Sequence, residues 1–506
     1  MDQIQRHFPG LKVDTSDLGI LDLPDTVILK IFANLSHPEL CRIAIVCKHW
    51  LWIVYDSALW EHLDLQQFHK VDEDCIVNLI QTRLSPLLKT LNLAKCSITP
   101  MLFNELTENC KQLSTLSLQG CSWDVAKEEQ DLLELSIPDK LTRLDIRNVG
   151  EYGSFIHLIF NAPDLSMLEC FGFGNGSCHY CPTFLDVSSL FSKMSNLRVL
   201  ECIDSECISD TTLGVIAENL PCLQSLNLKK CYKITGSSLS ILMARAFCLK
   251  SLLLAGTSVN DESLAAVSWK DSNIEELDLS LCDRITSDGL RSILPHLPYL
   301  QFLCLNNCGR GKAVTNEVMI DVSNRGLWTD LITLSFQFCC RLTGESLVVL
   351  SKCQNLERLS FRSCHRFGFS EVSASLRYFH KLKSLEVGTL FCSPERSSCW
   401  DQLLTSISDN CPLLEKLVLL KCSGTTLGNL RRFRSKIFEF LVKCKKLTNV
   451  CLLHCDAAFV NLFLECASSM LSERHIEITT SSLEDPIIPP FRHSLDAYMK
   501  ERGPLL

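Results

Sequence analysis

The sequence contains no run of about 18 consecutive apolar residues, the length that would indicate a membrane-spanning helix. Glycine and proline are scarce, at 21 and 17 of 506 residues, which excludes a collagen-like or low-complexity chain. Positive charge is also in short supply. The 49 Lys and Arg against 58 Asp and Glu give a net charge of -9, the wrong sign for a protein whose whole surface binds nucleic acid. With hydrophobic residues at 46%, we expect most of the chain to fold, without nucleic acid or membrane as a partner.

Cysteine, in contrast, is abundant, with 29 residues in 506. This share lies below the roughly 8–10% of small disulfide scaffolds, and a chain of this length has no need of such cross-links. Residues 1–9 are polar and charged and do not resemble a signal peptide. We therefore expect reduced, buried thiols in a protein of the cytoplasm or nucleus.

One pattern recurs along most of the chain. An apolar residue is followed by two variable positions, an apolar residue, one variable position, an apolar residue, two variable positions and often Cys. Copies begin at Leu88, Leu113, Leu141, Leu165, Leu197, Leu223, Leu249, Ile274, Leu300, Leu331, Leu356, Leu382, Leu414, Leu447 and, weakly, Glu473. Trp60, Leu63 and Leu65 make a partial copy ahead of them. A period repeated this often overrides any estimate of separate domains from chain length.

Each copy combines a short strand with a helix. Leu226 and Leu228 are separated by one variable residue, the spacing of a strand with one buried face. Ile234, Leu239 and Leu242 then follow at helical spacing. One such unit cannot bury its apolar side alone, so we expect stacked copies with an inner parallel sheet and outer helices. The predicted fold class is an α/β solenoid, and its pattern resembles the Cys-containing subtype of leucine-rich repeats, which implies a horseshoe.

Cysteine occupies the ninth place of nine copies: Cys96, Cys121, Cys231, Cys282, Cys308, Cys339, Cys364, Cys422 and Cys455. There we expect the thiol to act as a small hydrophobe that fills the turn after the strand. A catalytic thiol would need an activating His or cation, and no phosphate loop or nucleophile signature occurs. Cys178 and Cys181, with Cys170 and His179 nearby, have half of a zinc-site spacing but lack a second pair. We predict no enzyme activity, cofactor or metal.

The residues ahead of the repeats form a different module. Pro24 suits the start of a helix, and Ile28 and Phe32 lie on an apolar stripe at helical spacing. Ser36 and Glu39 fit a capping box in which Ser36 accepts a hydrogen bond from the Glu39 amide and Glu39 reaches back. A third, aromatic-rich helix follows. Three short helices hold too small a core to be stable alone, so they should lean on the repeats or on a partner.

This module resembles an F-box over residues 17–65. The resemblance rests on Leu23, Pro24, Ile31, Phe32, Leu35, Ser36, Leu40, Val46, Cys47, Lys48, Trp50, Leu59 and Trp60. An F-box followed by Cys-type leucine-rich repeats resembles the substrate receptors of Skp-cullin-F-box ubiquitin ligases. The resemblance implies that the F-box docks on a Skp-type adaptor, and through it on cullin and RING subunits, while the repeats hold a protein substrate. The adaptor-binding residues that it implies are Leu23, Pro24, Ile28, Ile31, Phe32, Leu35, Leu40, Val46, Cys47 and Trp50.

Two alternatives stay open at this point. The apolar residues of the module could serve its own core instead of a partner. The whole chain could also be a leucine-rich scaffold or inhibitor that acts outside any ligase, with the F-box-like helices only capping the solenoid. In either case the expected organisation is an N-terminal segment at 1–16, an F-box at 17–65, repeats over 66–480 and a tail at 481–506.

The fifth-place residues of the copies should line the inner face, because alternate strand residues point to opposite sides. Asp145, Glu169 and Glu201 fall there in three consecutive copies, an acidic track suited to a basic segment, with a solvated charged face as the alternative. Arg358 and Arg362 share one copy and could bind a carboxylate or phosphate. These five residues are substrate-binding candidates.

The last two clear copies predict an apolar patch on the inner face. It consists of Val418, Leu420, Cys451 and Leu453. Exposed patches of this kind usually mark a contact, so these four are also substrate-binding candidates. The competing occupant is the tail, through Phe491, Leu495 and Met499, once Ile487 and Ile488 have closed the end of the solenoid.

Overall fold

The computed structural model describes residues 20, 23–68, 71, 73–84, 87–123, 137–150, 159, 162, 164–174, 187–325, 328–388, 390, 399–422, 430–469, 476–480 and 491–500. The chain divides into two compact units, Met1–Leu141 and Thr142–Leu506. Within the described ranges, no helix combines the length and apolar character needed to cross a membrane.

Unit 1 begins with helices and continues with repeats. Its elements are α1 (Asp25–Phe32), α2 (His37–Ala44), α3 (Lys48–Val54), η2 (Ser57–Trp60), β1 (His62–Asp64), η3 (Gln66–Phe68), α4 (Glu73–Leu79), η4 (Ile80–Leu84), β2 (Thr90–Asn92), β3 (Ser97–Ile98), α5 (Pro100–Asn109), β4 (Thr115–Ser117) and β5 (Ser122–Trp123). Strands β1, β2 and β4 are parallel neighbours, and β3 pairs with β5. Helices α1, α2 and α3 are the three helices that the sequence predicted. Leu63, at the centre of the partial copy, pairs in register with Leu91.

The helical module of unit 1 is held by a small aromatic core. Phe32 and Trp50 meet edge to face with ring centroids 5.4 Å apart, and the Trp60 ring nitrogen donates to the Val54 carbonyl at 2.7 Å. The predicted capping box between Ser36 and Glu39 is present. Glu39 Oε2 accepts from the Ser36 amide at 2.8 Å and also from the Ser36 hydroxyl at 2.7 Å.

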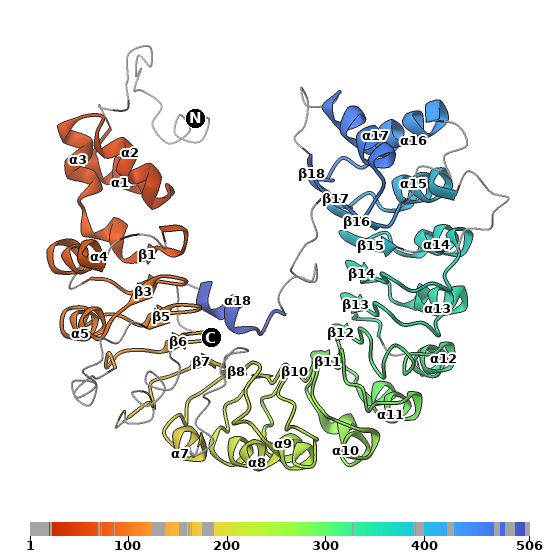
Figure 1. The fold of residues 1–506 in the computed structure, drawn as a ribbon, viewed down its shortest axis with the longest axis horizontal. Helices are drawn as coiled ribbons and strands as arrows, with labels where there is room; N and C mark the ends of the chain where they lie inside the picture. Colours follow the sequence, from red (N-terminus) through yellow and green to blue (C-terminus); the bar gives the residue numbers. More distant parts are fainter. Residues whose placement is uncertain are drawn as a thin grey trace, which may run out of the picture. The chain divides into compact units, whose positions relative to one another are not determined.

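Unit 2 is a succession of strand–helix repeats. Its strands are β6 (Arg143–Asp145), β7 (Cys170–Phe173), β8 (Val199–Cys202), β9 (Ser225–Asn227), β10 (Ser251–Leu253), β11 (Glu276–Asp278), β12 (Phe302–Cys304), β13 (Thr333–Ser335), β14 (Arg358–Ser360), β15 (Ser384–Gly388), β16 (Lys416–Leu420), β17 (Asn449–Leu453) and β18 (Glu477–Thr479). Each pairs in parallel with the next in chain order. The helices of the unit lie on the side of the repeats opposite the strands (Figure 1). The predicted α/β solenoid is confirmed.

The helices of unit 2 vary more in length than its strands. They are α7 (Val187–Phe191), α8 (Asp210–Asn219), α9 (Leu239–Arg245), α10 (Asp261–Ala265), η6 (Trp269–Asp271), α11 (Ser287–Ile293), η7 (Leu294–His296), α12 (Asn316–Asn324), α13 (Gly344–Val349), η8 (Leu350–Lys352), α14 (Phe369–Ser375), η9 (Leu376–Tyr378), α15 (Cys399–Asn410), α16 (Leu430–Lys443), α17 (Ala457–Ser468) and α18 (Leu495–Lys500). Several are short, so burial of their apolar side against the strands, and not helix propensity, stabilises them.

The register of the sheet follows the repeat pattern at most positions. The fifth places of successive copies are paired, as in Glu201 with Asn227. Two copies are misassigned: Gly172, not Glu169, pairs with both Asp145 and Glu201, and Thr479, not Glu477, pairs with Cys451. The first of these copies therefore starts three residues later than predicted, because two overlapping stretches both fit the apolar pattern, and the second starts two residues later. The predicted acidic track is wrong at its middle position.

A turn with left-handed backbone follows the strand in many copies. The residue before the repeat cysteine has positive φ in Lys230 (61°), Leu281 (58°) and Ser363 (59°), and glycine occupies the place in Gly120 (67°). Only glycine adopts this conformation without a steric cost. The turn directs the next residue, the ninth-place cysteine, back toward the core.

The buried repeat cysteines bond across neighbouring copies. The Cys121, Cys231 and Cys282 thiols lie 2.9, 2.7 and 3.1 Å from main-chain carbonyl oxygens of the preceding repeat. Burial raises the pKa of Cys231 to about 12 and that of Cys282 to about 11. Both groups are therefore neutral thiols near pH 7, in a structural role.

Candidate protein-binding surfaces

The helical module of unit 1 carries an unusually apolar exterior. Its exposed large apolar side chains are Ile20, Val27, Ile31, Ile45, Val46, Trp52 and Tyr55. Three stand out by exposure: Ile45 at 87%, Trp52 at 76% and Val46 at 62%. So many exposed apolar side chains on so small a module are unusual for a surface that stays in water, and they suit contact with apolar helices of a partner.

The predicted adaptor-binding residues separate into three groups by exposure. Pro24, Ile31 and Val46 are exposed, and Leu23, Leu35, Cys47 and Trp50 are half-buried. Ile28, Phe32 and Leu40 are buried in the module's own core, where they support the exposed surface from beneath.

The residues of this surface that the sequence did not indicate are Ile20, Val27, Ile45, Trp52 and Tyr55. Trp52 lies two residues after Trp50 on α3, which places the two indoles on opposite sides of the helix. That spacing was a usable signal: if Trp50 faces Phe32 in the core, Trp52 must face away from it.

On unit 2, the strand side of the repeats carries a buried charge cluster, centred on Arg147. Its guanidinium binds Asp145 at 2.7 Å and Glu201 at 2.8 Å, and all three side chains are at most 6% exposed. Arg147 also pairs with Asp496, whose side chain is half exposed. Burial works against the charged guanidinium, but the hydrogen bond and charge of Asp145 and the charge of Glu201 raise the Arg147 pKa. Burial raises the pKa of Glu201, although the charge of Arg147 acts to lower it.

A second polar group lies on β11 and β12. Glu276 is fully buried and accepts from the Arg492 amide at 2.7 Å and the His493 amide at 3.4 Å. The Arg492 guanidinium lies 5.1 Å from the centre of the Phe302 ring and donates to Gln301 at 3.1 Å. Burial raises the Glu276 pKa, while a Ser251 hydrogen bond, the His493 charge and both amides lower it. These residues lie at the third place of their copies, outside the fifth-place series, and a third-place series would have shown the acid at Glu276 and the aromatic residue at Phe302.

An apolar contact lies between the two polar groups. Leu495 and Tyr498 are buried against Cys170 and Val199, with Met499 beside them. In Figure 1, α18 lies beside β7 and β8, on the strand side of unit 2. Leu495 and Met499 therefore do not cover the Val418 patch, so the tail is not its occupant through these two residues, the alternative that the sequence left open. Phe491 also lies elsewhere, with its ring centroid 6.4 Å from that of Phe302.

The predicted apolar patch forms but is not exposed. Val418, Leu420, Cys451 and Leu453 make a cluster with exposed fractions of 0, 8, 2 and 3%. Ile487 and Ile488, predicted to close the end of the solenoid, lie outside the described residues.

The two predicted arginines have partners within unit 2. Arg362 lies 3.3 Å from Glu386, a buried carboxylate that also accepts from the Ser360 hydroxyl at 2.6 Å. Arg358 lies 6.0 Å from the Phe302 ring centre, and burial together with the Arg492 charge lowers its pKa, which Glu357 opposes. The carboxylate that Arg362 binds is thus one of this chain's own.

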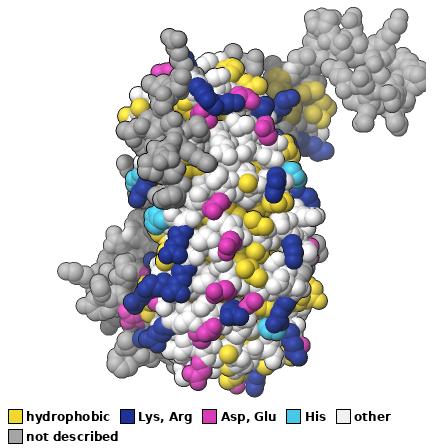
Figure 2. Space-filling model, turned by 90° about the vertical axis from the view of Figure 1, so that its right-hand side faces the viewer, with side chains coloured by type: hydrophobic (Ala, Val, Ile, Leu, Met, Phe, Trp, Pro, Cys, Tyr) yellow, Lys and Arg dark blue, Asp and Glu magenta, His cyan; other side chains and the backbone are white. Residues whose placement is uncertain are grey.

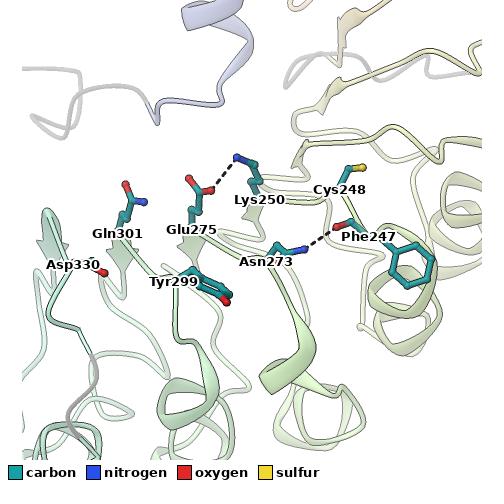
Figure 3. A pocket seen from close by; sticks show the side chains of 8 residues that line it. All are labelled: Phe247, Cys248, Lys250, Asn273, Glu275, Tyr299, Gln301 and Asp330. Atoms are coloured by element: carbon teal, nitrogen blue, oxygen red, sulfur yellow. Dashed lines mark hydrogen bonds and ion pairs between the residues drawn. The ribbon is translucent and has the colours of Figure 1, made fainter. Parts of the chain in front are cut away.

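A cavity of about 340 Å³ lies next to the contacts that Arg492 and His493 make. It is lined by Phe247, Cys248, Lys250, Asn273, Glu275, Tyr299, Gln301 and Asp330 (Figure 3). Lys250 pairs with Glu275 at 3.0 Å across its wall. Glu275 also lies 3.4 Å from the His493 ring, so the cavity borders the residues that Arg492 and His493 contact.

Two other features of the molecule give weaker indications of a binding site. In Figure 2, the side that lies to the right in Figure 1 shows acidic and basic side chains intermixed with scattered apolar groups, as on an ordinary solvated surface. Within the part of the chain that the structure describes, no group of three or more His, Cys, Asp or Glu could hold a metal ion. Cys178, His179 and Cys181 lie outside that part.

Comparisons with known proteins found two matching family models and several similar proteins. An F-box-like family model matches residues 20–66, and a Leucine Rich repeat model matches residues 270–294. F-box/LRR-repeat protein 12 of Bos taurus is 24% identical over 306 residues, covering 59% of this chain and 81% of that protein. Lysine-specific demethylase 2A of Xenopus tropicalis is 27% identical over 288 residues, 56% of this chain but 22% of that protein. A solved structure of Rad7 in complex with Elc1 from yeast aligns with a TM-score of 0.45 at 16% identity, covering 84% of this chain and 95% of that one.

Proposed function

We propose that this chain, which combines an F-box-like segment with leucine-rich repeats, is the substrate-recognition subunit of a Skp-cullin-F-box ubiquitin ligase. The F-box-like module binds a Skp-type adaptor, through which cullin and RING subunits join, and the repeats bind the protein to be ubiquitinated. The chain supplies binding and placement and takes no covalent part in ubiquitin transfer. It acts in the cytoplasm or nucleus.

The observation that carries this proposal is the exposed apolar surface around Val46 and Trp52. It lies within residues 20–66, the stretch that matches the F-box-like model. Side chains that stay exposed at 62% and 76% contribute little to the fold of the module, so their apolar character is best explained by a partner. Trp is also one of the residue types enriched in interface hot spots.

The test is capture of a purified Skp-type adaptor by the full chain. We expect Val46→Asp and Trp52→Ala each to weaken capture by about tenfold or more, because a buried interface aromatic or an inserted charge costs about 2 kcal/mol. Thermal unfolding should change little, since both side chains are exposed. A matched control is Val348→Asp, which changes a Val on α13 that is 60% exposed, close to Val46.

If Val46→Asp and Trp52→Ala bind the adaptor as well as the unaltered chain, the receptor proposal is wrong. The scaffold or inhibitor alternative would then account better for the same architecture.

A further inference from the structure

Residues Phe491–Lys500, here called the docked segment, return to strands that lie far earlier in the chain. The segment contacts β7 and β8 through Leu495 and Tyr498, and β11 and β12 through Arg492 and His493. The bond between the Leu495 amide and Glu201 joins residues 294 positions apart. This contact occupies the strand side of the repeats, where a ligand of a repeat protein commonly binds.

The surface beneath the docked segment binds the main chain of the segment through some contacts and its side chains through others. Buried carboxylates accept main-chain amides: Glu276 from Arg492 and His493, and Glu201 from Leu495 at 2.7 Å. Such bonds are available to any peptide. They fix the path of a bound segment without restricting its sequence.

Side-chain selection comes from three places on the same surface. Phe302 and Gln301 receive the guanidinium of Arg492, Arg147 pairs with Asp496, and Cys170 and Val199 bury Leu495 and Tyr498. A planar cation and a carboxylate thus each have a partner of their own, while the aliphatic and the aromatic group share a third, apolar place.

Gly172 makes room for the aliphatic group. A β-carbon at this position would overlap the Leu495 side chain, and it would also crowd Asp145 and Arg147, at 3.3 and 3.4 Å. The φ of Gly172 does not require glycine, so the missing side chain serves the contact with Leu495 and not the backbone. Gly172→Ala is therefore a probe of this surface at the place where Leu495 lies.

We propose that the surface formed by Arg147, Gly172, Glu201, Glu276 and Phe302 is a peptide-binding site, and that the docked segment occupies it as a stand-in for a segment of another protein. The fitting partner presents Arg, then Leu three residues later, an acidic residue next, and an aromatic residue two positions beyond. That this partner is a ubiquitination substrate rests on the proposed function, whereas the binding itself does not.

The arrangement implies competition between the two segments. A segment tethered to its own site acts at an effective concentration in the millimolar range, so an external segment of similar affinity binds poorly until the tethered one is displaced. Weakening the tethered segment without touching the surface should therefore strengthen external binding.

The test uses the full chain and a fluorescent peptide with the sequence of residues 491–500, followed by anisotropy. Leu495→Asp and Tyr498→Asp each remove an apolar contact of the docked segment and leave the surface intact. We expect both variants to bind the peptide about tenfold or more tightly than the unaltered chain does. Lys500→Ala, which changes an exposed residue of the same helix, should behave like the unaltered chain.

Adding Gly172→Ala to either release variant should remove the gained binding, and a scrambled peptide should not bind. If neither release variant gains binding, or if the gain survives Gly172→Ala, the proposal is overturned. Adaptor capture through Trp52, measured on the same variants, involves none of these residues. Loss of one activity with retention of the other therefore shows which proposal has failed.

Discussion

Replacing Arg147 by Met tests the buried charge cluster most directly. Methionine nearly fills the volume of the arginine stem but donates no hydrogen bonds. Asp145 would lose its bonds from Arg147 Nε at 2.9 Å and Nη2 at 2.7 Å, and Glu201 its bond from Nη1 at 2.8 Å. Both carboxylates are nearly inaccessible to water, so solvent cannot replace these donors.

We expect Arg147→Met to reduce the free energy of opening of the β6–β8 region by about 3–5 kcal/mol at pH 8, the usual cost of removing one partner of a buried ion pair. Burial already raises the pKa of Glu201 against the opposing Arg147 charge, and without Arg147 that pKa should rise further. A carboxyl with a folded pKa above its unfolded pKa destabilises the fold above the folded value, and this cost fades as pH falls through it. The variant should therefore lose less stability at pH 5 than at pH 8.

Hydrogen exchange resolved to β6–β8 is the suitable assay, because repeat proteins open locally and a single unfolding midpoint would average over the chain. Asp496→Asn, which changes the half-exposed member of the cluster, is the control and should cost less than about 1 kcal/mol. Arg147→Met with Glu201→Gln should recover part of the loss. A cost below 1 kcal/mol at pH 8, or one that grows on acidification, would refute the reasoning.

Three further predictions concern the cores of the two units. Phe32→Ala should destabilise the helical module by about 3–5 kcal/mol and abolish adaptor capture together with exchange protection of α1–α3, whereas Val46→Asp should weaken capture without loss of that protection. Cys231→Ser should lower the free energy of unfolding in urea by no more than about 1 kcal/mol, because the hydroxyl can donate to the same Cys202 carbonyl. Cys231→Ala should lower it by about 1–3 kcal/mol. Equal losses for the two variants would argue against the hydrogen bond. Cys231 and Cys282, with pKa values of about 12 and 11, should stay unreactive toward a thiol reagent at pH 8 in the native protein, and rapid labelling of either would contradict their burial.

The repeat architecture was predictable because its signal is local. Leu226 and Leu228 define a strand face by spacing alone, and the same spacing recurs often enough to predict a parallel sheet before any contact is known. The ninth-place cysteines follow from the same periodicity, as do the inner-face positions of Asp145 and Glu201. Where two overlapping stretches satisfy the pattern, around Glu169 and Gly172, spacing cannot choose between them, and strand pairing decides.

The surface of the F-box-like module was only partly predictable. The stripe of Ile28, Ile31 and Phe32 identifies a helix, but it does not say which of its residues face the other helices. Packing of Phe32 on Trp50 buries one side and leaves Ile31 and Trp52 outside.

The sequence by itself determined the strand–helix repeats, the separate helical module ahead of them and most of the residues on the inner face, because each of these depends on spacings of a few residues. Only the tertiary structure decided where the docked segment lies and which buried charges it meets. Asp496 and Arg147 are 349 positions apart, and nothing in the local pattern of either marks the other as its partner. Their contact exists because the stacked repeats bring Gly172, Glu201 and Glu276 onto one surface, which no short stretch of the chain contains.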